Sequence, residues 1–324
     1  MGPPNSYRGR FAPSPTGDLH LGCAATALVT WLAAREAGGR IVLRVEDLDT
    51  PRVVSNSLER QIEDLRWLGL DWDEGPGMGG AFAPYEQSKR QAGYEAAVAD
   101  LARRGLVYYC DCSRAEIARV ASAPHVGEEG PRYPGTCASF GMETRDWKRP
   151  PAIRLRVPDR VVTVMDRFQG EFSQNVSATV GDFVLRRGDG IFSYQLAVVV
   201  DDLAMEVGEV VRGADLLSSS PRQALLAELL GGAAPRFAHA PLVVSADGTR
   251  LAKRERGIAV RDHREAGVRG PEFVARVTHL LGLLPDAGVG AAVMPRELVG
   301  RGLLEHLRGR REVRTDSAFD LPEH

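Results

Sequence analysis

The first stretch of the chain predicts a strand, a helix and a second strand. Residues Tyr7 to Phe11 lead into a loop rich in proline and glycine, and Leu19 to Ala37 then places alanine, leucine and tryptophan at helical spacing. Two glycines end this helix, and Arg40 to Glu46 is rich in β-branched residues, as strands are. Two strands joined by a helix favour a parallel α/β sheet with a right-handed crossover.

The pattern changes in the middle of the chain. Two more helices are expected at residues 55–68 and 87–105. From about Tyr108 to Arg187 the sequence turns to proline, glycine, cysteine and short β-like runs. We interpret this part as an insertion rather than as part of the sheet. The α/β pattern returns at Gly190 to Val200, an apolar run that predicts a buried strand and the start of a helix.

The last third of the chain is expected to be mostly helical. A helix is predicted at about 222–230 and a strand at 241–244, before a basic loop. From about Gly257 the pattern is helical, and Pro271 stands where a helix would begin. We interpret the charged run 308–314 as a solvated helix face or tail.

The composition is that of an ordinary globular protein. The 324 residues are 44% hydrophobic and 26% charged, enough for one large domain with an insertion or for two or three modest domains. No apolar run is long enough to cross a bilayer and the first residues do not resemble a signal peptide, so we expect a soluble, cytoplasmic protein without membrane contact. The formal net charge of −2 means that a nucleic acid would have to bind a local basic patch.

Three of the four cysteines cluster in the insertion and suggest a metal site. Four cysteines are too few and too unevenly spaced for a disulfide framework. Cys110, Cys112 and Cys137 could supply three thiolates to a structural zinc ion, which needs one more ligand. By chemistry alone His125 is the preferred fourth ligand. The alternative is a set of three reduced cysteines without metal.

The loop between the first predicted strand and helix is a candidate nucleotide site. Open α/β sheets bind nucleotides at this point, and the first N–H groups of a helix are unpaired and electropositive. We expect His20 and these amides to face a phosphate, and Gly22 to let adenine or ribose approach the backbone closely. The alternative is a simple turn with a surface histidine.

Lys253 is a second candidate for phosphate binding. The chain has 41 basic residues, of which only Lys89, Lys148 and Lys253 are lysine. Lys253 lies in a basic loop, Arg250 to Arg254, after a predicted strand. A flexible ammonium can follow the charge that moves onto leaving pyrophosphate. A generic solvated loop would have been expected to carry arginine here.

Taken together, these segments resemble the catalytic core of class I glutamyl-tRNA synthetases. The matching stretches are Arg10 to Gly22, Leu43 to Arg52, Tyr194 to Asp202 and Val211 to Asp215. The basic loop is similar to the second class I signature, Lys-Met-Ser-Lys-Ser, with Arg250, Ala252 and Arg254 in place of one lysine and two serines. At the end of the first signature stands Cys23, where class I enzymes often have histidine.

The chain ends soon after Lys253, as in the truncated branch of this family, whose members lack an anticodon-binding region. That resemblance implies a class I α/β fold, in which a Rossmann-like parallel sheet carries a zinc-containing α+β insertion and a C-terminal helical region that contacts the tRNA stem. It places the first half of the catalytic core at 1–107, the zinc and acceptor-binding insertion at 108–188, the second half with the lysine loop at 189–255 and the helical region at 256–324. It also favours Tyr133 as the fourth zinc ligand.

The same resemblance implies that ATP, with Mg²⁺, activates L-glutamate, which is then attached to the queuosine base of tRNA(Asp). Glu46 is expected to bind the ammonium of glutamate and Arg212 its γ-carboxylate. The catalytic and ATP-binding residues are His20 and Lys253, with Gly22 at the nucleotide. The expected glutamate-binding residues are Arg10, Phe11, Ala12, Pro13, Ser14, Glu46, Tyr194 and Arg212.

We expect the protein to be a monomer. Two other functions are alternatives to glutamate transfer. A small adenylyltransferase would also use a His-x-Gly loop to hold ATP, but it would not need the glutamate-binding set or the cysteines. A zinc-stabilised tRNA-binding relative without catalytic activity would keep the fold alone.

Overall fold

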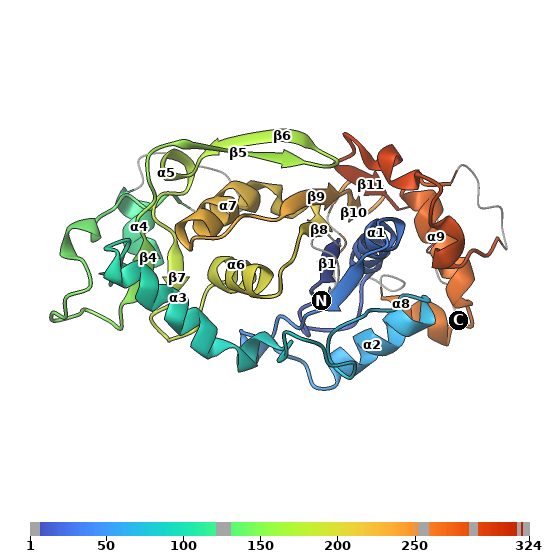
Figure 1. Cartoon of the computed structure of the whole chain (residues 1–324), viewed down its shortest axis with the longest axis horizontal. Helices are drawn as coiled ribbons and strands as arrows, with labels where there is room; N and C mark the ends of the chain where they lie inside the picture. Colours follow the sequence, from blue (N-terminus) through green and yellow to red (C-terminus); the bar gives the residue numbers. More distant parts are fainter. Residues whose placement is uncertain are drawn as a thin grey trace.

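A six-stranded sheet in the order β2-β1-β8-β9-β5-β6 forms the centre of the molecule (Figure 1). The computed structural model describes residues 7–120, 131–249, 251, 259–284, 291–315 and 319. Strands β1 (Arg8–Phe11), β2 (Arg40–Leu43), β8 (Glu209–Gly213) and β9 (Arg236–Ala240) are parallel. Helix α1 (Leu21–Glu36) joins β1 to β2, so the predicted strand-helix-strand unit is confirmed.

The remaining helices agree with most of the predicted helical stretches. Serine and proline at helix starts account for two of the boundaries, Ser193 before α6 and Pro271 in the first turn of α9. The other α-helices are α2 (Ser57–Trp67), α3 (Gln91–Arg103), α4 (Arg114–Val120), α5 (Val176–Thr179), α6 (Tyr194–Ala204), α7 (Ser220–Leu229), α8 (Val260–Glu265) and α9 (Gly270–Leu280). Short 3₁₀ helices are η1 (Thr50–Arg52), η2 (Gln87–Lys89), η3 (Ala138–Phe140), η4 (Ala214–Ser219), η5 (Pro295–Leu298) and η6 (Leu303–Leu307).

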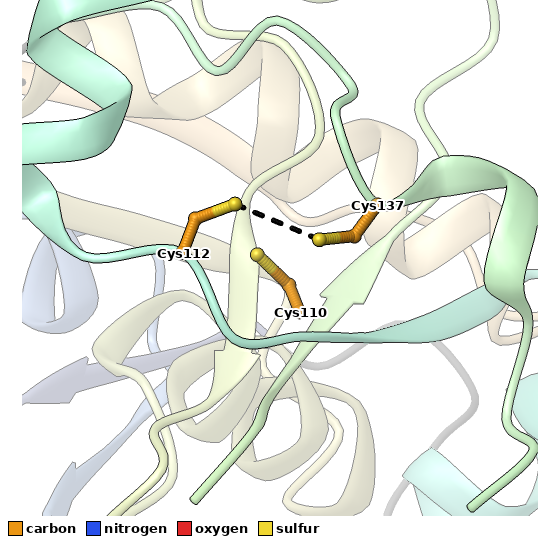
Figure 2. Close-up of side chains that lie close together, drawn as sticks. All are labelled: Cys110, Cys112 and Cys137. Carbon is orange, nitrogen blue, oxygen red and sulfur yellow. Dashed lines mark hydrogen bonds between the residues drawn. The ribbon is translucent and has the colours of Figure 1, made fainter. Parts of the chain in front are cut away.

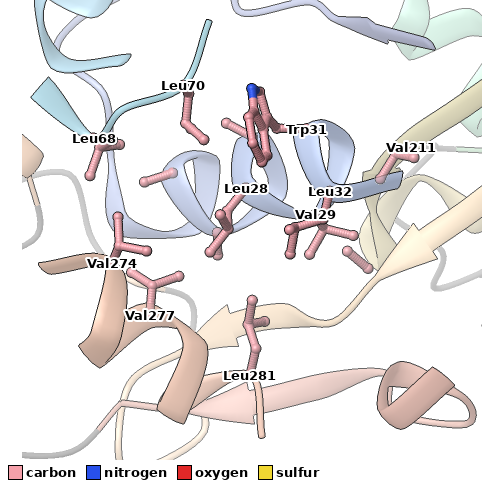
Figure 3. Close-up of a cluster of buried hydrophobic side chains, with 14 of the residues drawn as sticks. Leu28, Val29, Trp31, Leu32, Leu68, Leu70, Val211, Val274, Val277 and Leu281 are labelled. Atoms are coloured by element: carbon pink, nitrogen blue, oxygen red, sulfur yellow. The ribbon is translucent and has the colours of Figure 1, made fainter. Parts of the chain in front are cut away.

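Helix α1 lies at the centre of the main hydrophobic core. Figure 3 shows Leu28, Val29 and Leu32 of this helix among apolar side chains from β8 and from α9. Most residues of α1 are buried, which explains why its sequence is apolar on several sides rather than on one stripe. This packing fixes the position of the helix and therefore of His20, which precedes it.

The insertion contributes a sheet of its own and also extends the central one. Strands β3 (Val107–Cys110), β4 (Ala152–Leu155) and β7 (Val184–Arg186) form an antiparallel sheet at one end of the molecule (Figure 1). Strand β5 (Val161–Asp166) instead pairs in parallel with β9 and antiparallel with β6 (Gly170–Asn175). Our interpretation that the whole insertion lies outside the sheet is therefore wrong for β5 and β6. Alternate residues of β5 are buried, as expected of a strand with one covered face.

Two further predictions need correction. No strand forms within Gly190 to Val200, because α6 begins at Tyr194 with Ser193 as its N-cap; a fully buried apolar run does not distinguish a strand from a helix. The charged run 308–314 ends in a strand, β11 (Glu312–Arg314), which pairs in parallel with β10 (Leu242–Val244), instead of continuing as a helix face. The predicted strand at 241–244 is thereby confirmed. Within the described residues, no helix is long and apolar enough to span a membrane.

Candidate active site and metal centre

The loop after β1 and the segment after β2 lie side by side at the carboxyl edge of the sheet. The amide of Arg44 donates to the carbonyl of Phe11 over 2.9 Å, and the amide of Glu46 to the carbonyl of Pro13 over 3.0 Å. These bonds continue the parallel pairing beyond the ends of both strands. They place Glu46 next to the loop that contains Ala12 and the exposed Ser14. Phe11 and Pro13 thus help to position Glu46 through their backbone carbonyls.

Two arginines share one carboxylate of helix α6. Arg44 Nη1 donates to Asp202 Oδ1 over 2.6 Å, and Arg10 Nε donates to the same oxygen over 3.4 Å. Arg44 is completely buried, and its Nη2 donates to Glu46 Oε1 over 3.2 Å. Arg44 and Asp202 were not predicted as site residues, although both lie in the stretches that resemble class I glutamyl-tRNA synthetases. Asp202 and Arg44 together fix the orientation of Glu46.

Glu46 remains partly accessible to a cation. Its side chain is 12% exposed, whereas that of Arg44 behind it is fully covered. Burial raises the pKa of Glu46, and the charges of Arg44 and Arg10 oppose this rise. The carboxylate can therefore bind an ammonium group at the carboxyl edge of the sheet, where open α/β sheets bind their ligands.

Arg212 is buried among neutral hydrogen-bond acceptors. Its Nη1 donates to Gln223 Oε1 over 2.6 Å and to the hydroxyl of Tyr194 over 3.5 Å. Its Nη2 donates to Ser220 Oγ over 2.8 Å and to the carbonyl of Leu216 over 3.3 Å. No carboxylate of the described residues lies within ion-pair distance of this guanidinium, whose pKa burial lowers. An anionic ligand would supply the missing negative charge.

Tyr194 links the two groups of charges. Its hydroxyl accepts from Arg212, and the charges of Glu46, Arg10 and Asp202 all act on its pKa, which burial raises. Glu46, Arg10 and Arg212 therefore all lie close enough to Tyr194 to act on the same side chain. Ser220 and Gln223 were missed because both lie on α7, in a stretch without a distinctive motif.

Helix α1 begins at the edge of the sheet where β1 ends. His20 is its N-cap residue, and the His20 side chain makes no capping hydrogen bond to the first turn. A Cβ at Gly22 would meet only Val243, at 3.8 Å, so protein packing does not account for this glycine. Glycine in a helix costs about 1 kcal/mol relative to alanine. The role of Gly22 at a nucleotide stays a prediction.

The chain on both sides of the lysine loop contacts this helix start. The amide of Val260 donates to the carbonyl of Leu19 over 2.8 Å, and Ala259 forms a bridge with His20. On the other side, β10 packs against α1. Lys253, together with Arg250, Ala252 and Arg254, lies outside the described residues. Its role in binding phosphate stays a prediction.

The three cysteines of the insertion point their sulfur atoms toward one another (Figure 2). Their sulfurs lie within 4.8 Å of each other, and Cys112 Sγ is 3.6 Å from Cys137 Sγ. A tetrahedral zinc ion with Zn–S bonds of about 2.3 Å would hold its sulfurs about 3.8 Å apart. The geometry of the cluster therefore fits zinc.

Tyr133 completes this group, and Asp111 connects it to the next loop. The hydroxyl of Tyr133 lies 3.3 Å from Cys110 Sγ and accepts from the amide of Cys137 over 2.9 Å. His125 lies outside the described residues. Burial raises the pKa of Tyr133, and it raises the pKa of Cys112 to about 12, so both groups would need a bound cation to lose their protons. Asp111 accepts from Arg145 over 3.0 Å and ties that loop to the cluster.

Comparison with known proteins agrees with this site. Residues 6–293 match the family model described as tRNA synthetases class I (E and Q), catalytic domain. A glutamyl-Q tRNA(Asp) synthetase of Nitratidesulfovibrio vulgaris is 48% identical over 90% of this chain and 91% of its own. One of Nocardia farcinica is 47% identical over 92% and 94%. The chain belongs to the glutamyl-Q tRNA(Asp) synthetase family.

Solved structures of larger relatives share the fold of this family member. A glutamate tRNA ligase from Elizabethkingia meningosepticum, in complex with its amino acid, superposes with a TM-score of 0.79 at 28% identity. The similarity covers 97% of this chain and 68% of that protein. The resemblance to class I synthetases inferred from the sequence is therefore confirmed, as is the α/β class of the fold.

Proposed function

We propose that this chain activates L-glutamate with ATP and transfers it to the queuosine base of tRNA(Asp). The observation that carries the proposal is that Glu46 and Arg212 both lie close enough to Tyr194 to act on its pKa, in a chain of this family. We infer that these three side chains line one glutamate pocket. A zwitterionic amino acid with an acidic side chain needs a carboxylate for its ammonium and a guanidinium for its side chain.

Within this pocket, each group of glutamate has a partner. Glu46 binds the ammonium, held by Arg44 from behind, and Arg212 binds the γ-carboxylate together with Tyr194. The bonds of Arg212 to Tyr194 and Leu216 are its longest, at 3.5 and 3.3 Å, so they are the ones that a carboxylate would replace or share. Arg10 lies between these groups and faces the α-carboxylate.

ATP binds at the start of α1. Its phosphates lie against the amides after His20, its nucleoside lies near Gly22, and Mg²⁺ accompanies the phosphates. The α-carboxylate of glutamate attacks the α-phosphorus and pyrophosphate leaves, with Lys253 neutralising the charge that builds up on it. A hydroxyl of queuosine then attacks the activated carbonyl, which releases AMP and leaves glutamate esterified to the base.

Zinc has a structural role in this proposal. Cys110, Cys112, Cys137 and Tyr133 would hold it, and the bound ion would join the end of β3 to the loop that precedes η3. Asp111 connects the cluster to the following loop, because it accepts hydrogen bonds from Arg145 and, over 3.2 Å, from the backbone amide of Lys148. The metal thus supports the surface that receives tRNA rather than the glutamate pocket.

The acting unit in this proposal is a monomer. Its substrates are L-glutamate, ATP and tRNA(Asp) carrying queuosine, and we place it in the cytoplasm, where these substrates occur.

Glutamate-dependent exchange of pyrophosphate into ATP tests the first half of the proposal. The account predicts exchange with glutamate and little with glutamine or aspartate. A small adenylyltransferase would not respond to glutamate, and a tRNA-binding relative without activity would give no exchange.

A further inference from the structure

A carboxylate and an imidazole lie in line behind the guanidinium of Arg212. Arg212 on β8 and His239 on β9 are partners in the strand register, and Arg212 Nε donates to His239 Nε2 over 3.0 Å. His239 Nδ1 lies 2.5 Å from Asp166 Oδ2, at the end of β5. The side chains of His239 and Asp166 are completely buried.

The hydrogen bonds fix which nitrogen of His239 carries the proton. Arginine can only donate, so Nε2 of His239 must accept with its lone pair. The proton therefore sits on Nδ1 and is donated to Asp166. Burial lowers the pKa of His239, in agreement with a neutral ring. Ser220 Oγ lies 3.4 Å from the same Nε2 and can donate to it as well.

Asp166 is itself held firmly by the backbone. Its Oδ1 accepts from the amides of Phe168, Gln169 and His239, at 3.0, 2.8 and 3.1 Å. These bonds leave Oδ2 for the imidazole. The hairpin β5–β6 of the insertion thus delivers a fixed carboxylate to the central sheet.

We propose that Asp166 and His239 are positioning residues that set the orientation of Arg212 and thereby the selectivity for glutamate. The inference rests on the proposed function, in which Arg212 binds the γ-carboxylate. A guanidinium surrounded by neutral acceptors could rotate among them. The bond from Nε to His239 fixes the plane of the group and turns its outer edge toward Tyr194. The carboxylate of Asp166 keeps the imidazole in the tautomer that accepts this bond.

The variant Asp166→Asn changes the hydrogen bonding in the row formed by Asp166, His239 and Arg212 but nearly keeps the shape of the side chain. The amide oxygen can still accept from the backbone, but an NH₂ group would then face Nδ1 of His239. His239 would have to carry its proton on Nε2, opposite the N–H of Arg212. We expect the KM for glutamate in pyrophosphate exchange to rise about tenfold or more, with a loss of preference over glutamine and a nearly unchanged KM for ATP.

Matched variants separate this effect from a general loss of structure. Asp182→Asn alters another carboxylate of the insertion, which accepts from Tyr108 over 2.6 Å, and should leave the KM for glutamate unchanged. His239→Gln keeps one acceptor and one donor and should recover part of the affinity that His239→Leu loses. A folded Asp166→Asn protein with wild-type KM and selectivity overturns the proposal.

The tautomer can also be read directly in the unmodified protein. Nitrogen NMR of histidine-labelled protein should show Nδ1 of His239 protonated and Nε2 bare, and a proton on Nε2 overturns the proposal even if Asp166→Asn does not fold. A wild-type protein without glutamate-dependent exchange would instead contradict the proposed function, and the NMR result would still decide on the row.

Discussion

Arg44 Nη1 lies 2.6 Å from Asp202 Oδ1, and both side chains are buried. Asp202 belongs to α6 and Arg44 follows β2, so this contact joins the two halves of the catalytic core. The same guanidinium reaches Glu46, which makes the pair a support for the ammonium site as well as for the fold.

Removing one partner should therefore leave a buried charge without compensation. We expect Asp202→Leu to lower the free energy of unfolding by about 3–5 kcal/mol. Asp100→Leu, which removes an exposed ion pair with Arg103, should cost less than about 1 kcal/mol. Chemical denaturation of both variants checks this, and equal losses would contradict the role given to the buried pair.

The variant Arg212→Ala should remove the preference for glutamate. Without the guanidinium, a γ-carboxylate in the pocket loses a charge-assisted hydrogen bond, worth about 1.5–3 kcal/mol, whereas glutamine loses less. Comparing KM values for glutamate and glutamine in pyrophosphate exchange measures the change. Arg236→Ala, on the exposed side of β9, is the control. If the rate falls while the preference persists, Arg10 is the next candidate for the side chain.

Lys253→Ala should lower glutamate-dependent pyrophosphate exchange by two or more orders of magnitude, or about 3 kcal/mol. The reason is the loss of an ammonium that neutralises pyrophosphate as it leaves. Lys89→Ala removes an exposed lysine paired with Glu86 and should have no such effect. Near-normal exchange by a folded Lys253→Ala protein would remove Lys253 from this role.

The sequence predicted most of the fold, but only those residues of the candidate site that lie in recognisable motifs. The strand-helix-strand unit and the start of α9 could be located because periodicity, glycine pairs and Pro271 mark their ends. The place of β5 in the sheet could not be predicted, because β5 pairs with a strand about 70 residues away, β9, and such a pairing leaves no local signal in the sequence.

The supporting residues of the site were missed for a related reason. Glu46 and Arg212 lie in recognisable motifs, whereas His239 and Asp166 act only because neighbouring strands bring them into line. A single histidine in an apolar strand has no distinguishing pattern. The cysteines were the reverse case, because Cys-x-Cys spacing already restricts three sulfurs to one small region.

The free energy of unfolding depends on pH through the ionisation of Asp64. Burial raises its pKa to about 6, despite Arg264 at 3.3 Å. Because the folded pKa is above the unfolded value of about 3.9, this stability is fully present below about pH 4 and is lost as the pH rises through about 6. Asp64→Asn should therefore gain on the order of 1–2 kcal/mol relative to the wild type between pH 4 and pH 8. Denaturant unfolding at both pH values measures the difference, and a constant difference would contradict the account.

Cys112→Ala should separate the two halves of the reaction. The part of the insertion around the cysteines packs in a small apolar cluster with Tyr108 and Cys110, so we expect it to depend on a metal, whereas the rest of the chain has larger cores of its own. We expect the wild type to contain about one zinc per chain, and the variant to lose both the metal and transfer to tRNA while keeping most pyrophosphate exchange. Elemental analysis and the two assays check this. Loss of exchange together with transfer would show that the insertion supports the pocket directly.

Transfer of labelled glutamate to tRNA(Asp) with and without queuosine tests the central claim most directly. The account predicts ATP-dependent labelling of the queuosine-containing tRNA and none of the same tRNA with guanine at that position. Equal labelling of both forms, or labelling at the 3′ end, would contradict it.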